Sequence, residues 1–151
     1  MSGVETATLA FAVYGVGCQI VLTGFFAARR WWPRGAPWLG WVAYSYASLG
    51  LALGGTFLLV GESWRLYLGP IMLALWAGFG LVVDIWPRLE WRRPVRWRVL
   101  IPYVALYFWG QMLLWWPLWD LWRAAWFVFL AFFAVSTLLN LRGHFVETPR
   151  E

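Results

Sequence analysis

A few polar side chains interrupt the long apolar stretches of this sequence, and they are the residues that could do chemistry. Asp84 is the one carboxylate well inside such a stretch, and Gln19, Gln111 and Asn140 contribute amides. Amides both donate and accept hydrogen bonds, whereas a carboxylate can also carry a proton. Because a polar group at membrane depth is costly, it is by default a functional hypothesis. These four residues are the polar intramembrane candidates.

Asp84 has two interpretations. It lies shortly before Pro87, in what would be the last turn of a helix, where a negative charge opposes the helix dipole and needs a nearby cation. Arg88, four residues further on, could supply that cation, which favours a structural ion pair. The alternative is a proton-handling or substrate-binding role.

Other catalytic groups are scarce. Cys18 and His144 are the one cysteine and the one histidine, which excludes a disulfide or a histidine/cysteine metal cluster within one chain. All twelve cations are arginine, so a lysine Schiff base is excluded too. No combination of nucleophile, base and orienting group can be picked out. We therefore expect no metal and no cofactor, and an enzyme is unsupported, with Asp84 as the acid/base candidate.

The elements that position these residues are predicted to be membrane-spanning helices. Hydrophobic residues make up 62% of the 151 residues and charged residues 13%, with a mean hydropathy of +0.63. The apolar runs are about 20 residues long, the length that crosses ~30 Å of hydrocarbon. We place spans at about 7–28, 38–60, 66–86, 99–116 and 121–141. The sequence predicts an all-α polytopic membrane protein, a single bundle of five transmembrane helices over residues 1–151.

The positions of the arginines predict the orientation of this bundle in the membrane. Ten of them fall in the first connection, the third connection and the C-terminal tail, and the other side has only Arg65 and Arg123. The positive-inside rule then predicts an outside N-terminus and a cytoplasmic C-terminus. We expect an inner or plasma membrane of a prokaryote. This topology accounts for the net charge of +5, so we expect no nucleic-acid partner.

The third connection, RLEWRRPVRWRV, combines arginines with two tryptophans. Arg92, Arg93 and Arg96 suit anionic lipid head groups, or an acidic partner, on the cytoplasmic face. The alternative is that these charges only determine topology.

Gly50 and Gly54 form a GxxxG match in the second span. Small residues at this spacing let helix backbones approach closely. The motif could hold the bundle together internally or form a homodimer interface, and the pattern alone does not choose.

The stretch LWWPLWDLWRAAW joins the fourth and fifth spans at the outer boundary. Pro117 disfavours helix at Trp116, so we expect the fourth helix to stop there, with Asp120 capping the fifth helix and pairing with Arg123. The tryptophans then form an interfacial belt. From this part of the chain, only Trp109 and Trp126 lie deep enough in their helices to face a ligand.

The order Trp31-Trp32-Pro33, Pro37-Trp38, Trp41 and Tyr44, in a tryptophan-rich chain with five spans, resembles the TspO family of tryptophan-rich sensory or translocator proteins. Ser136-Thr137-Leu138-Leu139-Asn140-Leu141 is similar to that family's Ala-Thr-x-Leu-Asn ending. The resemblance implies a five-helix bundle, often dimeric, that holds porphyrins or sterol-like hydrophobes in a pocket closed by the first loop.

Three functions are compatible with the sequence. The first is a protein that binds, senses or moves a small hydrophobic ligand in an aromatic intramembrane pocket, with five wall residues: Trp38, Trp41, Tyr44, Trp109 and Gln111. The second is a non-catalytic accessory subunit of a larger membrane complex. The third is a transporter or lipid-handling enzyme that uses Asp84. Membrane lipids, a second copy of the chain or a membrane-complex subunit are the partners we expect.

Overall fold

The computed structural model describes the backbone of residues 3–85 and 96–145 and the side chains of residues 5–83 and 96–140. Over these residues the chain forms five long helices: α1 (Gly3–Trp31), α2 (Ala36–Val60), α3 (Trp64–Gly80), α4 (Trp97–Leu121) and α5 (Arg123–Phe145). A π-helical turn, Leu81–Ile85, continues α3. All five helices are long and apolar enough to cross a membrane. This confirms the predicted all-α architecture with five candidate spans.

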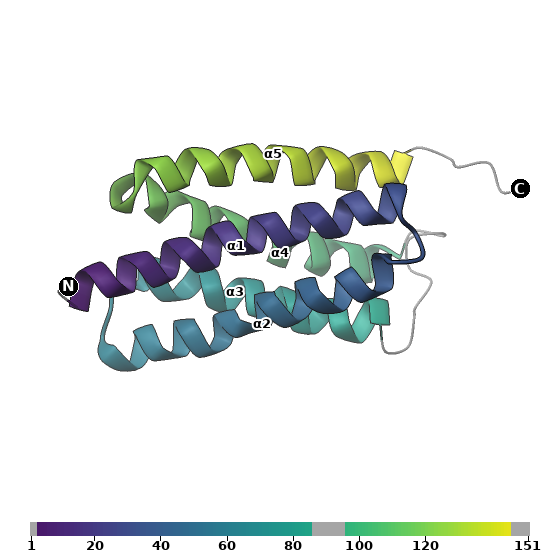
Figure 1. The fold of residues 1–151 in the computed structure, drawn as a ribbon. Coiled ribbons are helices and arrows are strands. Elements are labelled where there is room, and N and C mark those ends of the chain that lie inside the picture. The colour runs from purple at the N-terminus through teal and green to yellow at the C-terminus, as the bar shows by residue number, and fades with distance from the viewer. Residues whose placement is uncertain (1–2, 86–95, 146–151) are drawn as a thin grey trace, which may run out of the picture.

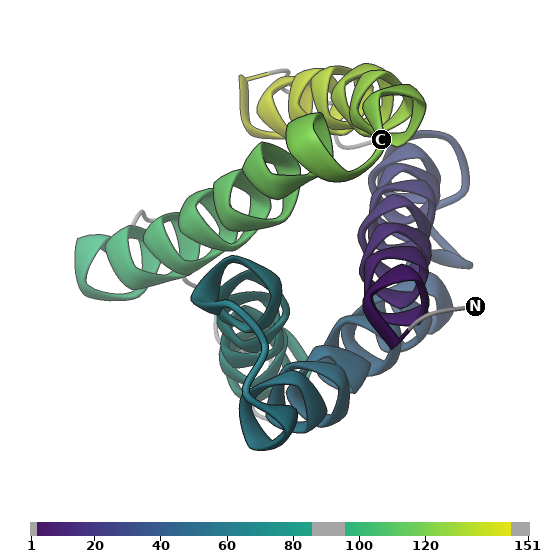
Figure 2. The same ribbon diagram turned by 90° about the vertical axis from the view of Figure 1, so that its left-hand side faces the viewer.

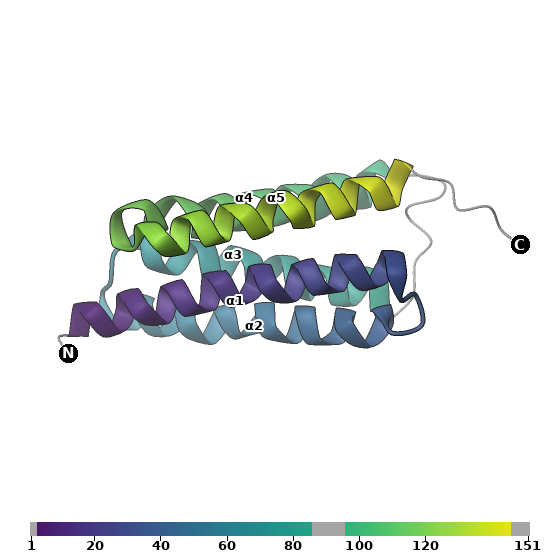
Figure 3. The same cartoon turned by 45° about the horizontal axis from the view of Figure 1, so that its top comes forward.

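The helices close a ring. Each one packs against its neighbours in the sequence, and α5 returns to pack against α1 (Figure 2). The α2–α3 and α4–α5 connections lie at the N-terminal end of α1, and the α1–α2 connection lies at the opposite end (Figures 1 and 3). Consecutive helices are therefore antiparallel, while α1 and α5 run in the same direction.

One helix departs from the ring's regular packing. α4 packs closely along α3 and much more sparsely along α5. Figure 2 shows why, because the N-terminal half of α4 diverges from the C-terminal half of α5. The seam between α4 and α5 is thus the loosest contact between consecutive helices.

Arginines gather at one end of the described bundle. Arg29, Arg30, Arg34, Arg96 and Arg98 lie where α1 ends and α4 begins, and Arg65 and Arg123 lie at the opposite end with Glu5, Glu62 and Asp120. The described arginines are therefore concentrated at one end of the bundle, as the sequence predicted. Arg92 and Arg93 lie outside the described residues, and Arg96 is exposed just before α4.

The GxxxG motif lies inside the bundle, in the interface between α2 and α3. Gly50 and Gly54 are both buried there. A Cβ added to Gly54 would lie 2.9 Å from the carbonyl oxygen of Tyr67, and one added to Gly50 would collide with the carbonyl oxygen of Pro70. Of the two roles that the sequence left open, the motif therefore serves internal helix packing.

The α4–α5 connection corrects one prediction. α4 does not stop at Trp116 but continues through Pro117 to Leu121, and Asp120 lies within this last turn. Asp120 pairs with Arg65 at 3.5 Å instead of with Arg123, whose guanidinium lies 5.0 Å from the Trp119 ring centroid. Proline removes one helical hydrogen bond, whereas ending the helix earlier would expose several more backbone groups to apolar surroundings.

Candidate functional site

A group of aromatic rings in tilted and edge-to-face contact lies in the interior, towards the arginine-rich end. Trp76 of α3 is its centre, with ring centroids 5.2 Å from Tyr44 of α2, 5.6 Å from Tyr103 of α4 and 5.3 Å from Tyr107 of α4. The hydroxyls of Tyr44 and Tyr103 are hydrogen-bonded at 3.2 Å. We call Tyr44, Trp76, Tyr103 and Tyr107 the aromatic cluster. It joins three helices through rings with polar tips, which suits recognition of a flat ligand.

Helical spacing and small neighbours place these rings. Tyr103, Tyr107 and Gln111 are each four residues apart, so they lie on one face of α4, turned towards the interior. A Cβ added to Gly80 would lie 2.5 Å from the Tyr44 ring, so the absence of a side chain there makes room for the tyrosine. The cluster therefore depends on a glycine of α3 as much as on its own aromatic residues.

A pair of amides crosses the bundle one turn beyond Tyr107. The Nε2 group of Gln19, on α1, donates a hydrogen bond to Oε1 of Gln111, on α4, and both side chains are fully buried. α1 and α4 otherwise make few contacts. This amide pair, Gln19 and Gln111, is therefore a specific polar link between two helices that are not neighbours in the ring.

Four buried polar atoms of the amide pair and the aromatic cluster have no hydrogen-bond partner among the described residues: Oε1 of Gln19, Nε2 of Gln111, Nε1 of Trp76 and the hydroxyl of Tyr107. The indole and amide nitrogens are donors, the phenol can donate or accept, and the Gln19 oxygen is an acceptor. Buried polar groups normally have partners, and leaving one without costs about 1–3 kcal/mol. The interior around the amide pair and the aromatic cluster is therefore rich in polar groups without partners.

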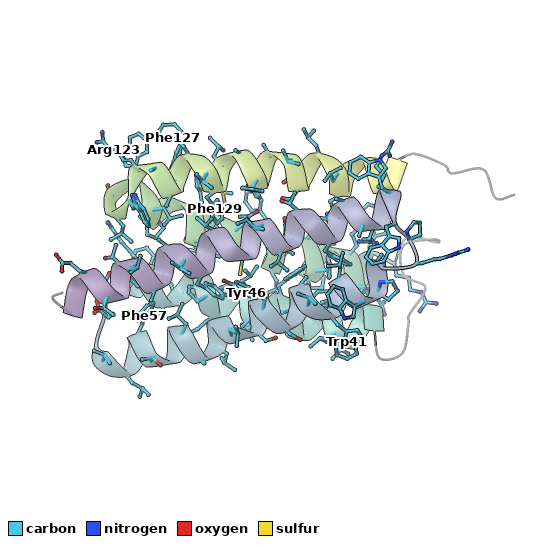
Figure 4. The ribbon with its side chains drawn as sticks, in the orientation of Figure 1. Trp41, Tyr46, Phe57, Arg123, Phe127 and Phe129 are labelled. Carbon is cyan, nitrogen blue, oxygen red and sulfur yellow. The ribbon has the colours of Figure 1, made fainter. Side chains whose placement is uncertain are left out.

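Two of the five predicted wall residues lie in the interior of the bundle. Tyr44 and Gln111 are buried in the interior. Trp38, Trp41 and Trp109 are 64%, 52% and 57% exposed and lie on outer faces of α2 and α4. Figure 4 shows Trp41 on the outer side of α2, near the α1–α2 connection. In this structure the three tryptophans would meet lipid or a partner.

The other polar candidates are spread over the bundle. Gln19 is at its centre, while Asn140 lies half-buried near the end of α5. The backbone of Asp84 belongs to the π-helical turn, and its side chain and Arg88 lie outside the described residues. Trp126 is partly buried and stacks on Trp115 with a centroid separation of 4.9 Å, at the end away from the aromatic cluster.

Sequence reasoning missed Trp76 as the centre of the site, and it missed Tyr103 and Tyr107. A signal for the tyrosines was present, since their four-residue spacing continues to Gln111. The signal for Trp76 is weaker, because tryptophans are distributed all along this chain.

No protein-family model matches the chain, and no curated protein and no solved structure does so either. The resemblance to the TspO family therefore rests on the quoted residues alone.

Proposed function

We propose that this protein binds, senses or moves a small, flat hydrophobic molecule inside its helical bundle. The unpartnered donors around Trp76 are the observation that carries the proposal. A ligand with carbonyl or carboxyl oxygens would accept hydrogen bonds from them while its apolar body lies against the rings. Within the porphyrin- or sterol-like class expected from the sequence, this chemistry favours members that carry such oxygens.

The sparse packing between α4 and α5 supports a route to this site. A hydrophobic ligand partitions into the membrane, so it would reach the bundle from the side. Separating α4 from α5 disrupts less packing than separating α2 from α3. We propose that the ligand passes between α4 and α5, next to Tyr107.

Tyr107→Phe is the sharpest test of the site. The hydroxyl makes no hydrogen bond of normal geometry, although Ser136 lies near it, so its removal should change the thermal stability little. The affinity for an oxygen-bearing porphyrin or sterol should fall about tenfold, the effect of one good hydrogen bond. The measurement is a titration of the protein in mild detergent, followed by the ligand's absorbance or fluorescence. Molecules that co-purify with the wild-type protein would identify the first ligands to try.

Tyr14→Phe is the matched control. The Tyr14 hydroxyl donates to the carbonyl oxygen of Ala47 at 2.7 Å, in the contact between α1 and α2. Its removal should lower stability by about 1 kcal/mol and leave binding unchanged. Equal affinities of the wild-type and Tyr107→Phe proteins for every ligand bound would contradict the proposed site.

A non-catalytic accessory subunit is the second candidate function. The exposed indoles of Trp38, Trp41 and Trp109 favour it, because aromatic side chains are enriched where membrane proteins meet partners or lipid head groups. If the purified protein binds none of the ligands and other membrane subunits, or a second copy of this chain, co-purify with it in stable proportion, this function replaces the first.

The proposed location is a prokaryotic plasma membrane with the N-terminus outside, and thiol labelling tests the orientation. Ser63→Cys, between α2 and α3, should react with a membrane-impermeant maleimide in intact cells, whereas Arg34→Cys should react only after permeabilisation. Cys18 is buried and should stay unlabelled in the folded parent. Labelling of Arg34→Cys alone in intact cells would reverse the topology.

A further inference from the structure

A second candidate site lies at the end of the bundle opposite the arginine-rich end, where α3 begins and α4 ends. A cavity of about 90 Å³ opens there between the two helices. Its walls are Trp64, Arg65, Leu113, Trp116 and Pro117. Pockets for drug-sized molecules start near 300 Å³, so this cavity would hold only a small group or one part of a larger molecule.

The backbones of α3 and α4 approach each other closely near this cavity. A Cβ added to Gly69 of α3 would lie 2.9 Å from the backbone of Leu113 and Leu114 of α4. Pro117 has no N–H group, so the carbonyl of Leu113, four residues earlier, lacks its usual helical donor. The two helices thus touch through a glycine that lies one helical turn after Arg65, one of the residues that line the cavity.

The rim of the cavity carries one charge of each sign. The guanidinium of Arg65 lies 3.5 Å from a carboxylate oxygen of Asp120, and both side chains are more than half exposed. Trp64 and Trp116, which are 49% and 67% exposed, extend the apolar wall to the outside of the bundle. Ligands from the membrane can therefore reach a cationic group, an anionic group and indole rings at the same place.

We propose that this cavity is a binding site for a zwitterionic phospholipid of the ethanolamine type. Its phosphate would bind Arg65, its ammonium would bind Asp120 and the faces of the indoles, and its acyl chains would follow the outer surface past Trp116. A purely anionic lipid fits less well, because Asp120, and also Glu62 and Glu5 at this end, would repel it. This site is separate from the aromatic cluster and does not depend on the function proposed there.

Native mass spectrometry of the full chain, delipidated in detergent and titrated with phosphatidylethanolamine or phosphatidylglycerol, tests the site. The wild-type protein should bind the first ethanolamine lipid about tenfold more tightly than the first glycerol lipid. Arg65→Gln should weaken ethanolamine-lipid binding about tenfold. Asp120→Asn should remove the preference between the two lipids.

Arg123→Gln is the charge-matched control, because Arg123 lies at the same end over Trp119 and away from the cavity. It should bind the ethanolamine lipid as the wild-type protein does. The exchange R65D together with D120R keeps an ion pair for stability but puts the acid at the phosphate position, so it should bind this lipid as weakly as Arg65→Gln. Thermal unfolding of each variant checks that the fold is kept.

Three outcomes overturn the proposal. The first is that Arg65→Gln and Arg123→Gln have equal effects, and the second is that the wild-type protein shows no preference between the lipids. The third is displacement of the bound lipid by millimolar glycerophosphoethanolamine, which would show that a soluble phosphate compound, and not a membrane lipid, fills the cavity. We expect no displacement, because the soluble compound lacks the acyl chains that lie along the indoles.

Discussion

Gly50→Ala is expected to destabilise the bundle by about 1–3 kcal/mol, the usual cost of forcing a methyl group into a packed interior. The added Cβ would collide with the carbonyl oxygen of Pro70 and with the hydroxyl of Tyr14. Neither can move freely, since Pro70 belongs to the backbone of α3 and the Tyr14 hydroxyl is held by its hydrogen bond to Ala47. α2 and α3 would have to separate, and their contact is the most extensive in the ring.

Gly55→Ala supplies the control on the same helix. No heavy atom lies within 4 Å of a Cβ added at Gly55, so the change should be neutral or should stabilise α2 by up to ~1 kcal/mol through its higher helix propensity. Thermal unfolding in one detergent, followed by loss of solubility or by helical signal, compares the two variants. A shift of roughly 5 °C between them corresponds to about 2 kcal/mol for a chain of this length.

The same pair of variants tests the role of GxxxG. If Gly50→Ala changes the oligomeric state and leaves the stability of the monomer as it was, the motif is a dimer interface and the α2–α3 contact described above is not the reason for these glycines. The expected result is the reverse, a less stable chain with an unchanged oligomeric state.

Sequence reasoning works well for the spans because their physics is local. The cost of an unpaired backbone group in lipid forces each apolar run into a helix, so length and hydropathy alone predict all five helices. The distribution of charge is local too, because the loop in which an arginine lies determines its end of the bundle. Each arginine could therefore be assigned to one end from the sequence. The helix ends were less predictable: α4 passes Pro117 because backbone pairing outweighs the loss of one hydrogen bond.

The interior of the bundle could be predicted only in part, because it depends on how each helix is rotated about its axis. In a soluble protein an apolar stripe shows which face turns inwards, but here both faces of every helix are apolar. Tryptophans such as Trp41 and Trp109 thus look the same in the sequence whether they face the lipid or the core. The two glutamines are the exception, since an amide is unfavourable against lipid whatever the packing, and both lie in the interior.

The other prediction with a large expected effect concerns the amide pair. Gln111→Leu should cost about 1–2 kcal/mol, because it leaves the amide of Gln19 buried without a partner, and Gln19→Leu should do the same to Gln111. Hydrogen bonds between membrane helices average only about 0.6 kcal/mol, so most of this cost comes from the orphaned amide and not from the lost bond.

The double variant Gln19→Leu with Gln111→Leu should therefore be as stable as the wild-type protein, or more stable, since two leucines of similar size replace two amides that are only half satisfied. Ser48→Ala is the control for removal of a partly buried polar group, because its hydroxyl donates to the carbonyl oxygen of Tyr44 within α2 and crosses no interface. A double-mutant cycle of unfolding free energies measures the coupling, expected at about 2–4 kcal/mol because each single change has a cost that the double variant does not.

The double variant should lose ligand affinity although it keeps or gains stability. If the amide pair recognises the ligand, the double variant keeps the fold and loses affinity about tenfold or more, as two polar contacts disappear. A polar pair that lowers stability and raises affinity has a function in binding. If instead the two single changes are coupled in stability but the double variant binds as the wild-type protein does, the pair is structural, and the donors at Trp76 and Tyr107 must recognise the ligand without it.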